Sequence, residues 1–313
     1  MVLHSLHIPN SQLYVSEPPP EWFGNGPNEV CAAYGPRLAL CVSPIAHCAL
    51  LLAGGMRQKS ATPDCCNCWT NGNWLKSRFH FSFAEYRNYK NTNFGCLRVM
   101  NDDLVQGNRG FGMHGHRDVE IVTYIVDGML THQDSTGTRE SLGRGSVQFM
   151  TAGSGIRHSE HNLMPSPLRF IQIWITPRAH GLKPAYGGFD GMTADAQAAR
   201  QNALSQLVGD RDNKEHRDVP VLIAQDCAMY CAELEPGRHV EFGLARGRQA
   251  YLLCVEGAIE AGGSGAGDDT PIQLVRHDAA EWRGEGVLRL TAGDAGAHLL
   301  LLEMALGEGG RGS

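Results

Sequence analysis

The chain has 313 residues, of which 42% are hydrophobic and 19% are charged, and its formal net charge is −6. This length is sufficient for two ordinary domains, and the acidic balance without a dense basic patch argues against a nucleic-acid-binding groove. The 38 glycines and the short apolar runs favour an all-β, turn-rich fold. Only four of the ten cysteines lie beyond residue 70, so that part of the chain has no disulfide scaffold, which fits a reducing compartment.

Residues 1–73 differ from the rest and are predicted to form a poorly structured N-terminal extension or a targeting segment. The apolar run 38–56 is roughly long enough to cross a bilayer, but Pro44 and His47 interrupt it and it begins too late for an ordinary signal peptide. The cysteines of residues 65–68 lack a second pair at zinc-like spacing, so reduced thiols are the favoured interpretation. Without the extension the chain is expected in the cytoplasm, or in the nucleus of a eukaryote; the extension could redirect it.

Residues 74–190 contain short strand-like segments at the spacing of a small barrel. Residues 119–126 are β-branched and apolar, and they end at Asp127-Gly128, a dipeptide typical of hairpin turns. The other predicted strands of this region are residues 79–81, 97–99, 130–132, 146–150 and 170–176.

A linker, residues 191–218, is predicted to contain the one helix, which Thr193 would cap and which would run to about Leu207. A second series of strands follows in residues 219–313. Its Cys254-Val255-Glu256-Gly257 resembles Ile125-Val126-Asp127-Gly128 of the first series, which indicates a duplicated barrel.

Two short pairs of candidate metal ligands lie in the first series. His114 and His116 are two residues apart, as are His158 and Glu160. Because residues i and i+2 of a strand point to the same face, two facing strands could place four ligands around one ion. Several imidazoles with one carboxylate suit a borderline first-row metal such as Fe(II), and suit Mg²⁺ or Ca²⁺ poorly.

When Gly128 is aligned with Gly257, Gly243 and Ala245 take the places of the first histidine pair. The second barrel is therefore predicted to lack metal ligands. His298 follows a Thr-Ala-Gly sequence as His158 does, but Leu300 stands where the glutamate would be, so His298 is interpreted as an ordinary strand residue.

The motifs HxHxxxE and GxxHxxxN resemble the two cupin motifs. More specifically, FGMHGHRDVEIVTY, GMLTHQDSTG, QFMTAGSGIRHSEHN and IQIWITP resemble the pirin family, above all its bacterial members with quercetin dioxygenase activity, over about residues 74–305. The resemblance implies two tandem cupin barrels, which are double-stranded β-helices of the jelly-roll type. It also implies a single iron in the N-terminal cupin, held by His114, His116, His158 and Glu160.

Four other polar residues near these motifs are given different roles. Glu120 lies an even number of residues from His114 and His116, so on a continuous strand it would share their face, and the glutamate at this position is a metal ligand in generic cupins. In the pirin family, however, the resemblance implies that the carboxylate ligand is Glu160. Glu120 is therefore predicted either to orient a ligating imidazole from outside the coordination sphere or to have a structural role. Arg117 either pairs with a nearby carboxylate or is a solvated charge. His132 and His161 are interpreted as polar barrel-face or surface residues.

The resemblance further implies a quercetin 2,3-dioxygenase-type reaction. A flavonol-like substrate would bind the metal through its 3-hydroxyl as the anion, and Glu160 could take the proton. O₂ would then cleave the ring with release of carbon monoxide. The second barrel is expected to close one side of the pocket with an apolar wall.

Two other functions remain open. Some pirins are non-catalytic, iron-binding, redox-sensing transcriptional co-regulators, which would imply a protein partner. Flavonol-dependent oxygen uptake would distinguish the enzyme from this regulator. A different cupin enzyme, such as an isomerase or a thiol dioxygenase, is the other alternative, although a three-histidine thiol dioxygenase would have no need of Glu160.

Overall fold

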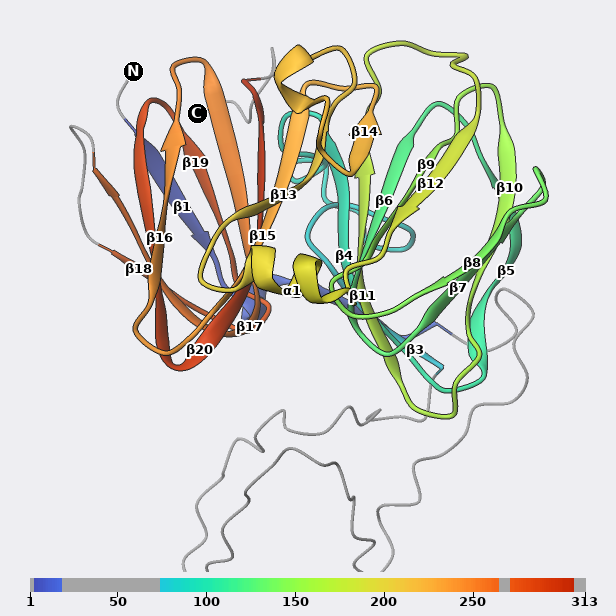
Figure 1. The fold of residues 1–313 in the computed structure, drawn as a ribbon, viewed down its shortest axis with the longest axis horizontal. Coiled ribbons are helices and arrows are strands. Elements are labelled where there is room, and N and C mark those ends of the chain that lie inside the picture. The colour runs from blue at the N-terminus through green and yellow to red at the C-terminus, as the bar shows by residue number, and fades with distance from the viewer. Residues whose placement is uncertain (1–2, 19–73, 265–270, 307–313) are drawn as a thin grey trace, which may run out of the picture.

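Two β-barrels lie side by side in the computed structural model, and a short helix lies between them (Figure 1). The structure describes residues 3–18, 74–264 and 271–306. The apolar run 38–56 and the cysteine cluster 65–68 lie outside the described residues. No helix in the described ranges is long and apolar enough to span a membrane.

The N-terminal barrel is made of two sheets. One has four strands in the order β5-β10-β7-β8, and the other has seven in the order β12-β9-β6-β11-β4-β3-β2. The bounds of these strands are β2 (Tyr14–Ser16), β3 (Leu75–Phe79), β4 (Leu97–Val105), β5 (Arg109–His116), β6 (Glu120–Asp127), β7 (Leu130–Asp134), β8 (Arg139–Leu142), β9 (Val147–Thr151), β10 (Ile156–Asn162), β11 (Leu168–Ile175) and β12 (Ala185–Phe189).

The C-terminal barrel has nine strands. Their order is β1-β19-β17-β20-β15-β13-β14, with β16 paired to β20 and β18 paired to β17. The bounds are β1 (His4–Ile8), β13 (Ser205–Asp210), β14 (Val221–Ile223), β15 (Cys227–Leu234), β16 (His239–Leu244), β17 (Arg248–Ser264), β18 (Ile272–Val275), β19 (Ala279–Arg283) and β20 (Gly286–Ala305).

Equivalent turns in the two barrels support the predicted duplication. Gly128 follows β6 with φ +84°, and Gly257 within β17 has φ +74°, so both occupy the left-handed region that glycine enters without strain. The all-β, two-barrel fold is therefore confirmed.

The helix α1 (Ala194–Arg200) begins where it was predicted and ends earlier. The Oγ1 of Thr193 accepts a hydrogen bond from the backbone N of Ala196 at 3.3 Å, as expected of an N-cap. The helix stops at Arg200 because the chain turns at Asn202, which has φ +57°, and enters β13.

The N-terminal extension is structured over part of its length, in contrast to the prediction for residues 1–73. Strand β1 pairs with β19 of the C-terminal barrel, and β2 pairs with β3 of the N-terminal barrel. Edge strands have unpaired backbone N–H and C=O groups, and residues 4–16 satisfy these groups on both barrels. Strands as short as β1 and β2 contain too few residues to show a hydrophobic repeat. Their pairing could therefore not be predicted from the composition of the extension.

A shared core holds the two barrels together. Buried side chains of β4 and β6, such as Met100 and Tyr124, belong to the same cluster as Tyr251 and Leu300 of the C-terminal barrel. Fixed in this way, the N-terminal barrel presents its four-stranded sheet away from the interface (Figure 1), and the predicted ligands lie on that sheet.

Candidate metal centre

Strands β5 and β10 bring the three predicted histidine ligands together. The strands pair antiparallel with His158 opposite His114 and Ile156 opposite His116. Strand alternation points these three imidazoles into the barrel. Their ring centroids are 4.5 to 4.9 Å apart, and their potential ligand nitrogens lie within 4.8 Å of one another.

The state of these imidazoles fits a bound first-row metal. His158 is 1% exposed, yet neither of its ring nitrogens has a hydrogen-bond partner among the described residues. Such a group is costly to bury unless a ligand satisfies it. Burial, followed by the neighbouring imidazoles, lowers the pKa of His116 and of His158 to about 3. Both are therefore neutral at physiological pH, which is the form that binds a metal.

Glu160 lies beside His158 with its carboxylate fixed by amide and hydroxyl groups. Its Oε1 accepts hydrogen bonds from Gln148 Nε2 at 2.5 Å and from Thr123 Oγ1 at 3.4 Å. Its Oε2 accepts from Gln172 Nε2 at 3.1 Å. In the pairing with β5, His158 lies opposite His114 and Glu160 lies opposite Phe111, so β5 has one extra residue between these two pairs. Oε2 accepts only one of these hydrogen bonds, so this oxygen keeps acceptor capacity for a metal or a proton.

His132, which the sequence predicted to be a polar barrel-face or surface residue, lies on the barrel face beside this site. It is 1% exposed, lies opposite Glu160 across the β7–β10 pairing, and belongs with His158 and Glu160 to a second group of potential ligands within 4.8 Å. Its Nε2 is 3.1 Å from Asp134 Oδ2, and its ring stacks on Tyr186 at 4.2 Å. The signal was the His-x-Asp alternation of GMLTHQDSTG, which puts both side chains on one face.

Glu120 and Arg117 are not brought to the imidazoles. Glu120 is fully buried, but it accepts a hydrogen bond from Thr151 Oγ1 at 2.7 Å and lies 3.6 Å from Arg211, on the side of the linker. The chain turns between β5 and β6, where Asp118 has φ +52°, so strand alternation does not continue from His116 to Glu120. The Arg117 side chain is 71% exposed and pairs with its neighbour Asp118 at 3.3 Å. The contacts of Glu120 fit the structural one of the two roles predicted for it.

A cavity of about 210 Å³ opens beside the histidines. Trp174 lies 4.9 Å from the ring of His116 and 5.3 Å from Phe83, edge to face in both cases. The lining residues are Ser16, Pro18, Leu75, Ser77, Phe79, Phe83, Ala84, Glu85, Asn101, Asp103, Phe111, His114, His116, Glu160, Gln172 and Trp174. All of them precede the linker, so the predicted apolar wall comes from the N-terminal barrel and residues 16–18 and not from the second barrel.

The comparisons with known proteins agree with this geometry. The family model described as Pirin matches residues 61–175, and the one described as quercetinase C-terminal cupin domain matches residues 213–304. A pirin-like protein of Caulobacter vibrioides is 37% identical over 232 residues, which cover 74% of this chain and 93% of that protein. The chain belongs to the pirin family.

Two further relatives of this pirin have names or structures that bear on the site. A quercetin 2,3-dioxygenase of Escherichia coli is 36% identical over 194 residues, which cover 62% of this chain and 79% of that protein. The crystal structure of the bacterial pirin YhhW from Escherichia coli, in complex with nickel(II), superposes with a TM-score of 0.64 at 30% identity and covers 75% of this chain and 93% of that one.

Among its described residues, the second barrel has no group of three or more potential metal ligands. Both groups of three or more potential ligands found in the described residues lie in the N-terminal barrel. Gly243 lies on β16, and Ala245 follows this strand.

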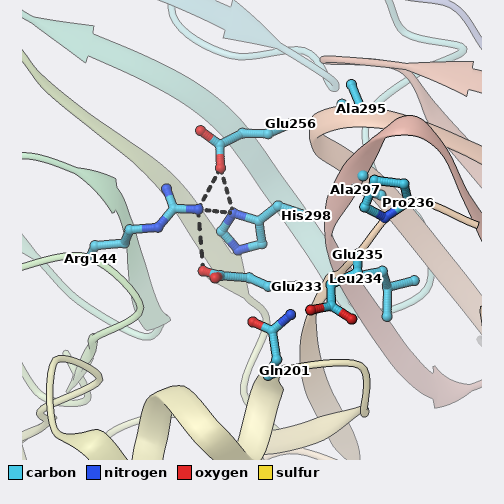
Figure 2. Close-up of a pocket in the computed structure, with 12 residues that line it drawn as sticks. Arg144, Gln201, Glu233, Leu234, Glu235, Pro236, Glu256, Ala295, Ala297 and His298 are labelled. Atoms are coloured by element: carbon cyan, nitrogen blue, oxygen red, sulfur yellow. Dashed lines mark hydrogen bonds and ion pairs between the residues drawn. The ribbon is translucent and has the colours of Figure 1, made fainter. Parts of the chain in front are cut away.

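His298 is more than the ordinary strand residue it was predicted to be. Figure 2 shows it at a polar cavity of about 260 Å³ between the barrels, with Arg144, Glu256 and Glu233. Arg144 lies 2.6 Å from Glu256 and 3.2 Å from Glu233, and His298 Nδ1 lies 3.0 Å from Glu256. Although burial opposes it, hydrogen bonds from His298 and Arg144 hold the pKa of Glu256 below its ordinary value. These charges pair with one another across the interface and therefore join the barrels.

Proposed function

We propose that this pirin is a dioxygenase with one Fe(II) that opens the ring of a flavonol-type substrate with O₂. The observation that carries the proposal is the convergence of three imidazoles, with Glu160 beside them, at the end of a cavity walled by aromatic side chains. The relatives named quercetin 2,3-dioxygenase support the choice of substrate class.

His114, His116, His158 and Glu160 would hold the metal. When bound, Fe(II) supplies a Lewis acid that lowers the pKa of a coordinated substrate hydroxyl and makes reaction with O₂ possible. The chain's own task is to take the released proton, and Glu160 borders the cavity with its carboxylate held by two amides. Those amides fix its orientation before the substrate arrives.

The cavity suits a flat aromatic ligand. Phe83 and Trp174 provide ring faces and edges for stacking, and Trp174 Nε1 has no hydrogen-bond partner among the described residues, so it can donate to a ligand oxygen. Burial raises the pKa of Asp103 to about 8, so this carboxyl is mostly neutral at pH 7 and does not repel an anionic substrate. In the overall reaction both oxygen atoms of O₂ remain in the ring-opened ester, and one ring carbon leaves as carbon monoxide, so no further oxidant or reductant is needed.

The test is metal content together with quercetin-dependent oxygen uptake and carbon monoxide release, measured on protein loaded anaerobically with Fe(II). We expect about one iron per wild-type chain with turnover, loss of iron and turnover in His114→Ala, and a fall in turnover of about 100-fold or more in Glu160→Gln. His239→Ala, an exposed histidine of the second barrel, is the matched control and should behave as wild type.

Three results would contradict the proposal. A Glu160→Gln protein that keeps both its iron and full turnover would remove the proposed proton acceptor. Stoichiometric iron with no oxygen uptake in the wild type would favour the iron-sensing co-regulator instead. An inability to bind iron would overturn both functions.

A further inference from the structure

The short strand β2, which precedes the N-terminal cupin motifs by about ninety residues in the sequence, is part of the wall of the metal-site cavity. In its antiparallel pairing with β3, Ser16 lies opposite Ser77 and Tyr14 lies opposite Phe79. Residues directly opposite one another on paired strands point to the same face. Because Ser77 and Phe79 line the cavity, β2 extends the inner face of the barrel by one strand.

Two rows of side chains continue from β2 towards the metal ligands. Ser77 lies opposite Asp103 on β4, and Phe79 lies opposite Asn101. The second row goes on to Gln172 of β11, which donates to Glu160.

The position of β2 in the sheet sets its distance from Gln172 of β11. Strand β2 is three strands beyond β11, which is about 14 Å along the sheet at the usual strand spacing. A single ring bound at the metal would not extend over that span, whereas a ligand with a second, distal ring would.

The segment is held in place at both ends. Tyr14 stacks on Tyr86 with ring centroids 4.9 Å apart and on Phe79 at 5.8 Å, and Ser16 Oγ donates a hydrogen bond to Glu85 Oε1. Towards the N-terminus, the backbone N of Asn10 donates to Asp278 Oδ1 at 2.5 Å, beside the pairing of β1 with β19. Residues 4–18 are thus anchored on both barrels, and Ser16 and Pro18 are buried.

We propose that β2 and Pro18 determine which flavonols enter the cavity, by contacting the distal ring of the substrate. Ser16 and Glu85 form a hydroxyl–carboxylate pair that accepts hydrogen bonds from phenolic hydroxyls on that ring, and Pro18 packs against its face. The identity of the ligand rests on the proposed function, whereas the role of β2 as a wall rests on the cavity alone.

The test compares two substitutions on the same strand. Ser16 points into the cavity, whereas Val15 points to the other face of the sheet and is 43% exposed. We expect Ser16→Phe to raise the Kd for quercetin at least tenfold. The Kd for catechol should stay within twofold of the wild-type value, because this single ring reaches only the metal. Val15→Phe should leave both values unchanged. Binding is measured anaerobically on iron-loaded protein, and the iron content is recorded for each variant.

A second variant avoids the risk that a large side chain disturbs the fold. Ser16→Ala removes only the hydroxyl, and we expect it to reduce the preference for quercetin over 3-hydroxyflavone, which lacks distal hydroxyls, about threefold or more. Equal behaviour of Ser16→Phe and Val15→Phe, or an unchanged preference in Ser16→Ala, would overturn the proposal even if the wild type turns over quercetin. Quercetin binding that depends on Ser16 without oxygen uptake would overturn the proposed dioxygenase and support the wall. A wild-type protein that binds no quercetin would overturn both.

Discussion

The phenol oxygen of Tyr124 and Nε2 of His298 lie 2.8 Å apart at the buried interface between the barrels. Glu256 Oε2 lies 3.0 Å from His298 Nδ1; in the tautomer in which Nδ1 donates to this carboxylate, Nε2 accepts the hydrogen bond from Tyr124. Tyr124 follows Thr123 on β6, and Thr123 contacts the carboxylate of Glu160 from the opposite face of the strand. One strand therefore carries a contact of the metal site on one side and a contact between the barrels on the other.

Removal of the Tyr124 hydroxyl is expected to weaken the interface without harm to the core. Tyr124→Phe keeps the buried ring but leaves His298 Nε2 without its donor, so the free energy of unfolding should fall by about 1–2 kcal/mol. Urea denaturation followed by circular dichroism measures the change. Tyr89→Phe, in which the ring is 89% exposed, is the control, and a loss as small as that of the control would contradict the assigned hydrogen bond.

The buried ion pair between Asp102 and Arg169 should make a larger contribution to stability. Arg169 is 3% exposed and donates two hydrogen bonds to Asp102, at 2.8 and 2.7 Å, while His277 of the second barrel lies 2.5 Å from the same carboxylate. Asp102→Asn leaves the guanidinium buried without its counter-charge, and we expect a loss of about 3–5 kcal/mol in unfolding free energy.

The matched control for Asp102→Asn is Glu241→Gln, which removes the carboxylate of a surface pair with Arg289. Both side chains of that pair are 55% exposed, so its loss should change stability by less than about 1 kcal/mol. If the two substitutions lowered the free energy of unfolding equally in urea denaturation, burial would not increase the contribution of the Asp102–Arg169 pair to stability.

The amide of Gln148 is expected to tune the metal site without touching the metal. Gln148→Leu removes the 2.5 Å hydrogen bond to Glu160 Oε1, so the carboxylate loses orientation and the iron affinity should fall about 10–100-fold. Competition with a metal chelator measures this affinity. The control is Gln273→Leu, which removes a similar amide–carboxylate contact, 2.7 Å to Glu260 on the surface of the second barrel. This control should leave the iron affinity unchanged. An equal loss of iron affinity in both variants would contradict a local effect of Gln148.

The sequence predicted the fold and the histidines of the site because both depend on local spacing. His114 and His116, and likewise His158 and Glu160, share a face through strand alternation alone, and the turn at Asp127-Gly128 needs only a glycine. The surroundings of Glu120 could not be predicted from spacing in the same way. A positive-φ residue between two strands resets the alternation, and no periodicity reveals such a turn.

Contacts between distant segments were out of reach of the sequence. The pairing of β2 with β3 joins residues separated by about sixty positions, and nothing in Tyr14-Val15-Ser16 indicates a partner. His298 has the same limitation, since its hydrogen bond to Tyr124 requires the packing of one barrel on the other. At His298 the strand was predicted and its neighbour was not, whereas at residues 14–16 neither was predicted.

His80 links the barrels in a way that makes stability depend on pH. It is 1% exposed and its Nδ1 lies 2.7 Å from Tyr251 Oη of the second barrel. Burial lowers its pKa from 6.5 to about 4, although the negative charge of Asp102 opposes the shift. Between these two values the unfolded chain binds a proton at this residue and the folded chain does not, so stability is lost as the pH falls from 6.5 towards 4.

His80→Gln is therefore expected to reduce the acid sensitivity of the fold. Between pH 7 and pH 5 the wild type should lose about 2 kcal/mol more unfolding free energy than this variant, since each pKa unit corresponds to about 1.4 kcal/mol and about 1.5 units of the shift lie above pH 5. Urea denaturation at the two pH values measures the difference, with His239→Gln on the exposed surface of β16 as the control. The difference arises because the glutamine has no proton to gain, so it should persist in metal-free protein. An equal pH dependence in wild type, variant and control would show that His80 does not titrate in this range.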